Sequence, residues 1–233
     1  MDLKETDILG DSIGEHWYYR SKAAATRRLL GEAPIKRILD VGAGSGFFSH
    51  HLLTHTAARE AWCVDISYPA DSSASTAGKP VHYRRSIDTV DADLVLLMDV
   101  LEHVDDDLGL LKSYVDKVPS GSRFLMTVPA FRFMWSGHDD FLEHKRRYTL
   151  GQFESLTKNA GLTVERGAYY FGAVFPIAVA SRLIPGGSAP RSQLKKHHPL
   201  VNTLLKTLCR LELPLMGMNR LAGLSVFVLA RKP

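Results

Sequence analysis

The sequence predicts an α/β protein with a doubly wound, mostly parallel sheet of seven strands and helices on both faces. Short apolar runs alternate with helix-like segments along most of the chain. One run, at residues 93–100, is apolar almost throughout, as expected of a parallel strand buried on both faces. A turn containing Gly42, Gly44 and Gly46 joins an earlier run to the helix behind it. With 233 residues, 45% of them hydrophobic, the chain can bury one sizeable core.

Apolar runs, caps and breakers give the order of the elements. Pro34 ends an N-terminal helix that contains an aromatic cluster. The acids at 105–107 favour the start of a helix, and Thr149 with Gln152 has the spacing of a capping box. Residues 67–80 are rich in Ser and Ala, which predicts a mobile loop. We expect strands at 35–41, 61–64, 81–85, 93–100, 123–128, 162–170 and 224–231, and helices at 12–30, 47–56, 105–118 and 149–159.

The glycine turn has the features of a nucleotide-type site. Glycine lets the backbone turn tightly and approach a ligand, and the helix beyond the turn supplies unpaired N–H groups. The dinucleotide fingerprint is G-x-G-x-x-G with an acid about 20 positions later. Here the spacing is G-x-G-x-G, Asp40 precedes the first glycine, and Asp65 ends the next apolar run. Because Asp40 would repel a pyrophosphate, the turn favours a cationic ligand without phosphate.

In the glycine turn at 40–46, in Asp65 and in the string DVLEHV at 99–104, the chain resembles the class I S-adenosylmethionine-dependent methyltransferases. The resemblance covers about 35–163 and 224–231. It implies a Rossmann-like sheet in the order 3-2-1-4-5-7-6 with an antiparallel last strand, and S-adenosylmethionine as the cofactor. The cofactor residues that it implies are Tyr18, Arg20, Asp40, Gly42, Ala43, Gly44, Asp65, Ile66, Ser86, Ile87, Met98, Asp99, Val100 and His103.

Residues 129–149 form the segment with the most chemically active side chains. It holds five aromatic residues, two histidines and several charged residues, and it follows a strand end, which places it over the site. An oxygen acceptor must lose a proton, and histidine titrates near neutrality. His138 and His144 are therefore candidate bases, with Asp139 or Glu143 to orient them. A surface loop with solvated basic residues is the alternative, and the sequence does not establish that a base is needed.

The sequence predicts neither a metal site nor a disulfide. His51 and His55 share one helical face, but H-E-x-x-H is absent and no third ligand is evident. Cys63 and Cys209 lie far apart, which favours a reducing, cytoplasmic location. No apolar run reaches the roughly 18 residues that a bilayer span requires.

An insertion of about 50 residues separates the last two predicted strands. Within it, residues 182–220 contain seven Lys or Arg and a single acid, Glu212, whereas the whole chain carries only +4. Basic residues beside apolar helical faces are typical of a helix on an anionic membrane surface. A roof over a lipid or polyprenyl-linked substrate, a homodimer interface and ordinary packing helices remain alternatives. Nucleic acid is not expected, because the basic residues are not interleaved with stacking aromatics.

We therefore expect one methyltransferase domain, with an N-terminal helical cover at 1–34, a core at 35–170 and 224–233, and a helical insertion at 171–223. The expected reaction is direct in-line methyl transfer, at oxygen, to a small molecule or to a sugar- or lipid-linked acceptor. The segment FLEHKRRYT resembles parts of uncharacterised bacterial methyltransferases. A non-catalytic S-adenosylmethionine-binding partner subunit and a nicotinamide-dependent oxidoreductase are the alternatives, and Asp40 disfavours the second.

Overall fold

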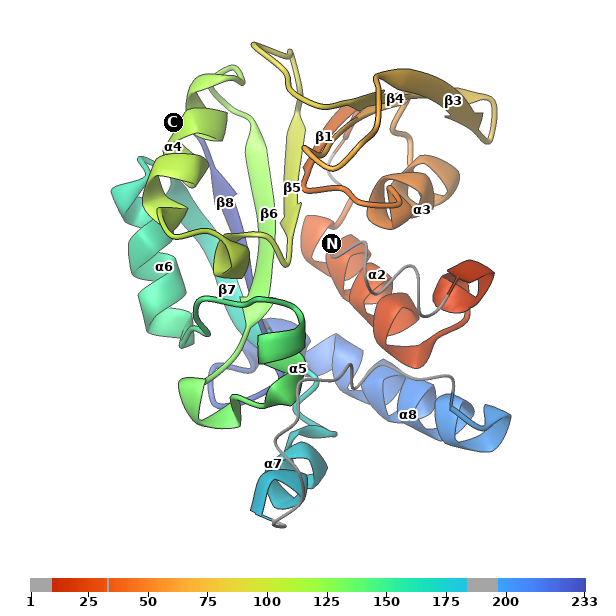
Figure 1. The fold of residues 1–233 in the computed structure, drawn as a ribbon, viewed down its shortest axis with the longest axis vertical. Helices are drawn as coiled ribbons and strands as arrows, with labels where there is room; N and C mark the ends of the chain where they lie inside the picture. Colours follow the sequence, from red (N-terminus) through yellow and green to blue (C-terminus); the bar gives the residue numbers. More distant parts are fainter. Residues whose placement is uncertain (1–9, 33, 184–196) are drawn as a thin grey trace.

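A computed structural model describes residues 10–32, 34–183 and 197–233, which build a mixed sheet between two layers of helices (Figure 1). The sheet has eight strands in the order β3-β4-β2-β1-β5-β6-β8-β7. The strands are β1 (Arg37–Val41), β2 (Glu60–Val64), β3 (Ser72–Thr76), β4 (Lys79–Arg84), β5 (Leu94–Met98), β6 (Arg123–Pro129), β7 (Thr163–Tyr170) and β8 (Ser225–Arg231). The helices are η1 (Gly10–Gly14), α2 (Trp17–Leu30), α3 (Phe47–His55), η2 (Leu101–His103), α4 (Asp107–Asp116), η3 (Arg132–Met134), α5 (Gly137–Phe141), α6 (Leu150–Asn159), α7 (Phe175–Leu183), α8 (Pro199–Glu212) and η4 (Leu213–Met218).

The seven predicted strands are present, and their order confirms the order that the resemblance implied. β4, β2, β1, β5 and β6 run parallel, whereas β8 pairs antiparallel with both β6 and β7. The helical insertion lies between β7 and β8 as expected. The predicted capping box also forms, because the Thr149 hydroxyl accepts a bond from the Gln152 N–H and Gln152 Oε1 accepts one from the Thr149 N–H.

The prediction of a mobile loop at 67–80, and with it the count of seven strands, was wrong. Ser72–Thr76 forms an eighth strand, β3, that pairs antiparallel with β4 at the edge of the sheet. Ala77 and Gly78 connect the two strands, both with positive φ, as a two-residue hairpin turn requires. The strand escaped prediction because an edge strand with exposed side chains lacks the apolar alternation by which strands are found.

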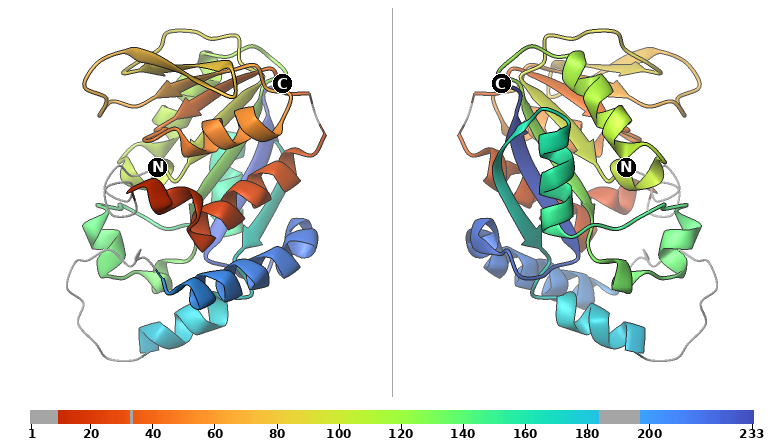
Figure 2. Two further views of the ribbon diagram at one scale, coloured as in Figure 1. Left: turned by 90° about the vertical axis from the view of Figure 1, so that its right-hand side faces the viewer. Right: turned by 90° about the vertical axis from the view of Figure 1, so that its left-hand side faces the viewer.

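Alternate residues of each central strand pack against different helical layers. Ile38 of β1 belongs to the core cluster beneath α2, α3 and α8, and Leu39 belongs to the cluster beneath α4 and α6. The two side views show these layers on opposite faces of the sheet (Figure 2). Asp40 lies two residues after Ile38 on β1, so its side chain points to the same face of the sheet, toward α3, where Ser49 contacts it.

The insertion is tied to the rest of the chain by hydrogen bonds. Asn202 of α8 accepts a bond from the Trp17 N–H at 2.8 Å, and the Tyr170 hydroxyl donates to the Cys209 carbonyl at 3.0 Å. The Glu212 carboxylate accepts a bond from the Gly172 N–H at 3.0 Å, where β7 leads into α7. These bonds hold α7 and α8 beside the carboxyl ends of β5 and β6. Of the basic segment 182–220, residues 184–196 lie outside the described part of the chain.

Across the described ranges, the helices are all too short or too polar to cross a membrane.

Candidate active site

The turn after β1 is built from glycines that other residues could not replace without strain. Gly42, Gly44 and Gly46 have φ of 62°, 53° and 73°, in the left-handed region. A Cβ atom on Gly42 would come within 2.7 Å of Val100 Cγ2. Gly46 is also the N-cap of α3, so the turn leads directly to the positive end of that helix. The result is a bend of bare backbone, with Val100 packed against it.

Two carboxylates flank this bend. Asp40, the last residue but one of β1, is almost fully buried and accepts a hydrogen bond from Ser49 Oγ at 2.7 Å. Burial, with the Asp65 carboxylate adding to it, raises the pKa of Asp40 to about 6. Asp65 follows β2, and its two oxygens accept bonds from the Gly44 N–H at 3.0 Å and the Ser67 N–H at 2.9 Å.

The surroundings of Asp65 fit the nucleoside part of the expected cofactor. A carboxylate offers about four acceptor positions, so Asp65 can receive the hydroxyls of a ribose beside its present bonds. Ile66, next in the chain, is 85% exposed and provides an apolar surface for a base. Ser86 and Ile87 follow β4, where Ser86 is exposed and Ile87 half-buried. Ala43 and Met98 are buried, so a cofactor could reach only their backbone atoms.

Lys22 of α2, rather than Arg20, reaches the end of β5. The Lys22 side chain is fully buried and forms an ion pair with Asp99, whose other oxygen accepts a bond from Thr127 Oγ1 at 3.0 Å. Burial lowers the pKa of Lys22, but the Asp99 carboxylate outweighs this effect and the pKa ends above its ordinary value. Arg20 instead lines a separate groove between α2, α3 and α8, together with Arg27. Lys22 is not among the site residues predicted from the sequence, although its spacing from Tyr18 and Tyr19 places it on the buried face of the helix.

A cavity of about 350 Å³ lies beyond Asp99, at the carboxyl ends of β5 and β6. The expected site residues Tyr18, Asp99, His103, His138 and His144 all lie on its wall. α7 closes one side with apolar residues, and Arg147 and Arg182 add positive charge. Its other apolar lining residues include Trp17, Met134, Leu142, Val174, Ile177, Leu205 and Leu224.

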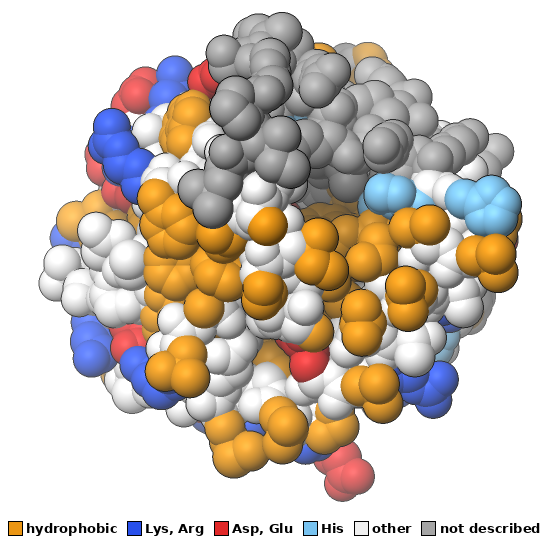
Figure 3. All heavy atoms as spheres, turned by 90° about the horizontal axis from the view of Figure 1, so that it is seen from below, with side chains coloured by type: hydrophobic (Ala, Val, Ile, Leu, Met, Phe, Trp, Pro, Cys, Tyr) orange, Lys and Arg blue, Asp and Glu red, His pale blue; other side chains and the backbone are white. Residues whose placement is uncertain are grey.

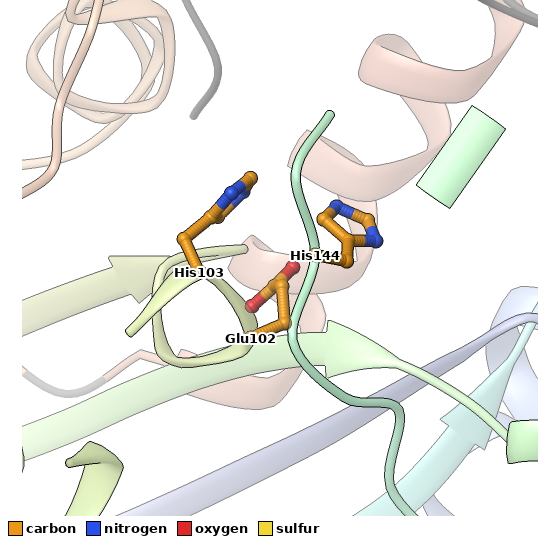
Figure 4. A group of neighbouring side chains, drawn as sticks. All are labelled: Glu102, His103 and His144. Atoms are coloured by element: carbon orange, nitrogen blue, oxygen red, sulfur yellow. The ribbon is translucent and has the colours of Figure 1, made fainter. Parts of the chain in front are cut away.

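Glu102, His103 and His144 meet at the polar end of this cavity (Figure 4). Glu102 and His103 come from η2, and His144 comes from the segment after α5. One nitrogen or oxygen atom from each lies within 4.8 Å of the others. Burial and the nearby Asp99 carboxylate raise the pKa of Glu102 well above its ordinary value. The sequence could not show this group, because two segments about 40 residues apart contribute to it.

Asp139 orients His144 but is not itself on the cavity wall. Its Oδ1 lies 2.9 Å from His144 Nδ1, and its Oδ2 accepts bonds from Arg147 Nη2 at 3.0 Å and from the Ser136 N–H at 2.8 Å. The sequence places Asp139 there because Ser136 and Asp139 form the capping box of α5. A carboxylate only accepts hydrogen bonds, so Nδ1 of His144 carries the proton and Nε2 is left for a ligand. Glu143, the other proposed orienting residue, is exposed.

His138 lies on the same wall of the cavity. Burial lowers its pKa to about 4, against the opposing effect of the Asp139 carboxylate. The imidazole is therefore neutral at pH 7, and its ring nitrogens can exchange hydrogen bonds with a bound molecule. Of the three residues expected to be catalytic, two lie on the cavity wall and the third holds one of them in place.

Comparison with known proteins agrees with this geometry. A family model described as a methyltransferase domain matches residues 15–166, more than half of the chain. A search of curated proteins finds no match.

Solved structures share the fold at low sequence identity. A chain from the complex between the Haloferax volcanii Trm112 methyltransferase activator and a methyltransferase is 15% identical, with a TM-score of 0.62 over 100% of this chain and 95% of that chain. A SAM-dependent methyltransferase from Archaeoglobus fulgidus is 17% identical, with a TM-score of 0.56 over 99% and 98% of the two chains. The family match, the strand order and the glycine turn between two acids lead to one conclusion: the chain belongs to the class I S-adenosylmethionine-dependent methyltransferases.

Proposed function

We propose that the enzyme methylates an oxygen atom of an amphipathic acceptor, a small molecule or a lipid- or sugar-linked compound, held in the 350 Å³ cavity. The observation that supports this proposal is the shared wall of the cavity. Tyr18 and Asp99, expected beside the cofactor, line the same space as His138 and His144. A cofactor held on the glycine turn would therefore face an acceptor in the cavity.

The cavity suits an acceptor with an apolar body and a polar reacting end. Ile177, Leu205 and Leu224 line its apolar part, and Glu102, His103 and His144 form its polar end. When bound, S-adenosylmethionine supplies a methyl group that is already activated for displacement. The protein therefore contributes mainly alignment of the acceptor and exclusion of water. An acceptor hydroxyl must also lose its proton, and we place that activation at the polar end.

The surface around α7 and α8 supports a lipid-linked acceptor at an anionic membrane. Ile177 lies on the cavity wall and is also 64% exposed, so the cavity opens onto this surface. Seen from below, apolar side chains gather over this face of the molecule (Figure 3). Lys206 and Arg210 of α8 line the neighbouring groove toward α2 and α3 and form no ion pair with the described residues, so they add positive charge beside this surface. The exposed apolar residues of α8 and η4 are Leu200, Val201, Leu204, Leu211, Leu215 and Met218.

An acceptor screen with a matched pair of variants tests the proposal. S-adenosylhomocysteine formation is measured with hydroxylated aromatic, prenyl-linked and sugar-linked compounds, and carbon NMR of the product identifies the methylated atom. Ala178→Phe fills the cavity and should raise the acceptor KM without changing S-adenosylmethionine affinity. Ala180→Phe, on the exposed side of the same helix, should change neither. Methyl transfer to nitrogen or carbon, or equal KM values in both variants, would contradict the proposal.

A further inference from the structure

The group formed by Glu102, His103 and His144 has the composition of a metal site. Two imidazoles and one carboxylate converge, with a ligand atom from each within 4.8 Å of the others. Their side chains project into the same space at the end of the cavity (Figure 4). Zinc binds such ligands at about 2.0–2.2 Å, which allows two ligand atoms at most roughly 4.4 Å between them. Small side-chain rotations therefore suffice to bring the three ligands onto one ion.

Glu102 supplies an independent observation that a ligand is required. Its side chain is 0% exposed, yet neither carboxylate oxygen has a hydrogen-bond partner among the described residues. A buried polar group without partners costs roughly 1–3 kcal/mol, and a charged one costs more. Lys22, whose charge acts on Glu102, is already paired with Asp99. A protonated Glu102 would not resolve the problem, because its hydroxyl would still lack an acceptor.

The residues around His144 are those that hold a metal-binding histidine in place. Its Nδ1 donates to Asp139 Oδ1 at 2.9 Å, which leaves Nε2 for a cation. Metal-binding histidines commonly donate their other ring N–H to a carboxylate, which fixes the tautomer. Asp139 is in turn held by Arg147, at 3.0 Å between Oδ2 and Nη2. This outer arrangement is complete without any contribution from solvent.

We propose that Glu102, His103 and His144 bind one divalent transition-metal ion, of the class to which zinc and cobalt belong. Two imidazole ligands favour such ions over magnesium or calcium, which prefer oxygen. Three protein ligands leave at least one position open toward the cavity. On the proposed function, an acceptor oxygen takes that position, where a cation lowers its pKa and releases its proton to water. The oxygen then forms its bond to the methyl carbon while the carbon–sulfur bond breaks and sulfur keeps the electron pair.

Metal content tests the site without any knowledge of the acceptor. The full chain is stripped with a chelator, loaded with cobalt or zinc, and dialysed, and bound metal is measured by mass spectrometry and by cobalt absorption bands. We expect one ion per chain. Glu102→Gln and His103→Gln should each weaken cobalt binding at least about 100-fold, and Asp139→Asn, which removes the outer carboxylate, about 10–100-fold.

His55→Gln is the matched control, because His51 and His55 stack at 4.3 Å between ring centroids on α3 and could capture metal adventitiously. Binding that survives in Glu102→Gln but disappears in His55→Gln would overturn the proposal, as would the absence of metal in the unaltered chain. A cooperative urea unfolding transition, measured for each variant, shows that each is folded. If the chelator-treated chain does not take up cobalt but still methylates its acceptor, the metal-site proposal is wrong and the proposed function stands. If the chain binds cobalt at this site but methylates no oxygen acceptor, the proposed function is wrong and the metal-site proposal stands.

Discussion

The Lys22 ammonium of α2 and the Asp99 carboxylate after β5 form an ion pair in which the lysine side chain is fully buried. Asp99 has a φ of 57°, a conformation that its bonds to Lys22 and Thr127 help to hold. The pair joins the N-terminal helix to the end of the sheet where the cavity begins. It gives α2 a defined position over the site, which an amphipathic helix alone would not provide.

Loss of this pair should destabilise the fold. Lys22→Met leaves Asp99 without its cation, and breaking a buried pair typically costs about 3–5 kcal/mol. We expect the free energy of unfolding, measured by urea titration, to fall by that amount. Arg20→Met, two positions away on an exposed site, should change it by less than about 0.5 kcal/mol. Equal effects of the two variants would show that the pair is not a structural link.

Gly42 and Gly151 should respond to alanine in opposite directions. At Gly42, alanine meets both the left-handed φ of 62° and Val100 Cγ2 at 2.7 Å, so the fold should lose at least about 1–2 kcal/mol. At Gly151, inside α6, a Cβ atom meets nothing within 4 Å, and alanine should stabilise by about 0.5–1 kcal/mol. Val100→Ala should recover part of the loss at Gly42 by removing the contact. A Gly42→Ala protein of unchanged stability would argue against a strained bend.

Asp40 should make the stability of the ligand-free protein fall as pH rises. Its pKa is about 6 in the fold and 3.8 ordinarily, so between these values the folded state binds more protons than the unfolded state. Through this group, the free energy of unfolding should fall by about 2 kcal/mol from pH 4 to pH 6, by roughly 0.4 kcal/mol more up to pH 7, and stay level above. Asp40→Asn removes this contribution. Parallel stability curves for the two proteins between pH 4 and pH 7 would contradict the assignment.

The same titration should control cofactor binding. A sulfonium favours the ionised form of Asp40, and the ionised fraction falls about tenfold from pH 7 to pH 5. Calorimetry should therefore show S-adenosylmethionine binding weakening about tenfold over that range. The Asp40→Asn variant should bind more weakly at pH 7 and show no such slope. A slope retained in this variant would place the titrating group elsewhere.

Membrane attachment should depend on the exposed apolar residues of α8. Leu204 and Leu211 are 59% and 70% exposed. Leu204→Ser with Leu211→Ser should reduce sedimentation with anionic liposomes by at least about fivefold, because each leucine contributes roughly 1.5–3 kcal/mol when fully buried. Thr203→Ser with Thr207→Ser, on the same helix, is the control. Equal sedimentation of both double variants would exclude α8 as the contact surface.

Most of the fold could be predicted from the sequence, because buried parallel strands leave apolar runs at regular intervals along the chain. The seven strands were predictable from this pattern, as were the glycine turn and the Thr149 cap, whereas the strand order was implied only by the resemblance to the methyltransferase family. β3 was not, since its side chains are polar and exposed and its pairing depends on a turn at Ala77 and Gly78. Local patterns identify buried strands well and exposed edge strands poorly.

The sequence identified many of the residues of the site but not the contacts between them. Asp99, His103 and His144 each follow the end of a strand, so they were expected near one another, and all three line the cavity. Spacing could not distinguish Lys22 from Arg20, because the difference depends on how α2 rotates against the sheet. The sequence named Asp139 and Glu143 as candidate orienting residues, and only the packed structure shows that Asp139 contacts His144. Contacts between segments require the packed structure.

A crystal structure with S-adenosylhomocysteine would show whether the cofactor and the cavity form one site. We expect the ribose hydroxyls to bind Asp65, the base to lie along Ile66, and the sulfur to face the cavity lined by Tyr18 and Asp99. Density for the ligand in the groove between α2, α3 and α8, or a ligand whose sulfur is separated from the cavity by protein side chains, would contradict it.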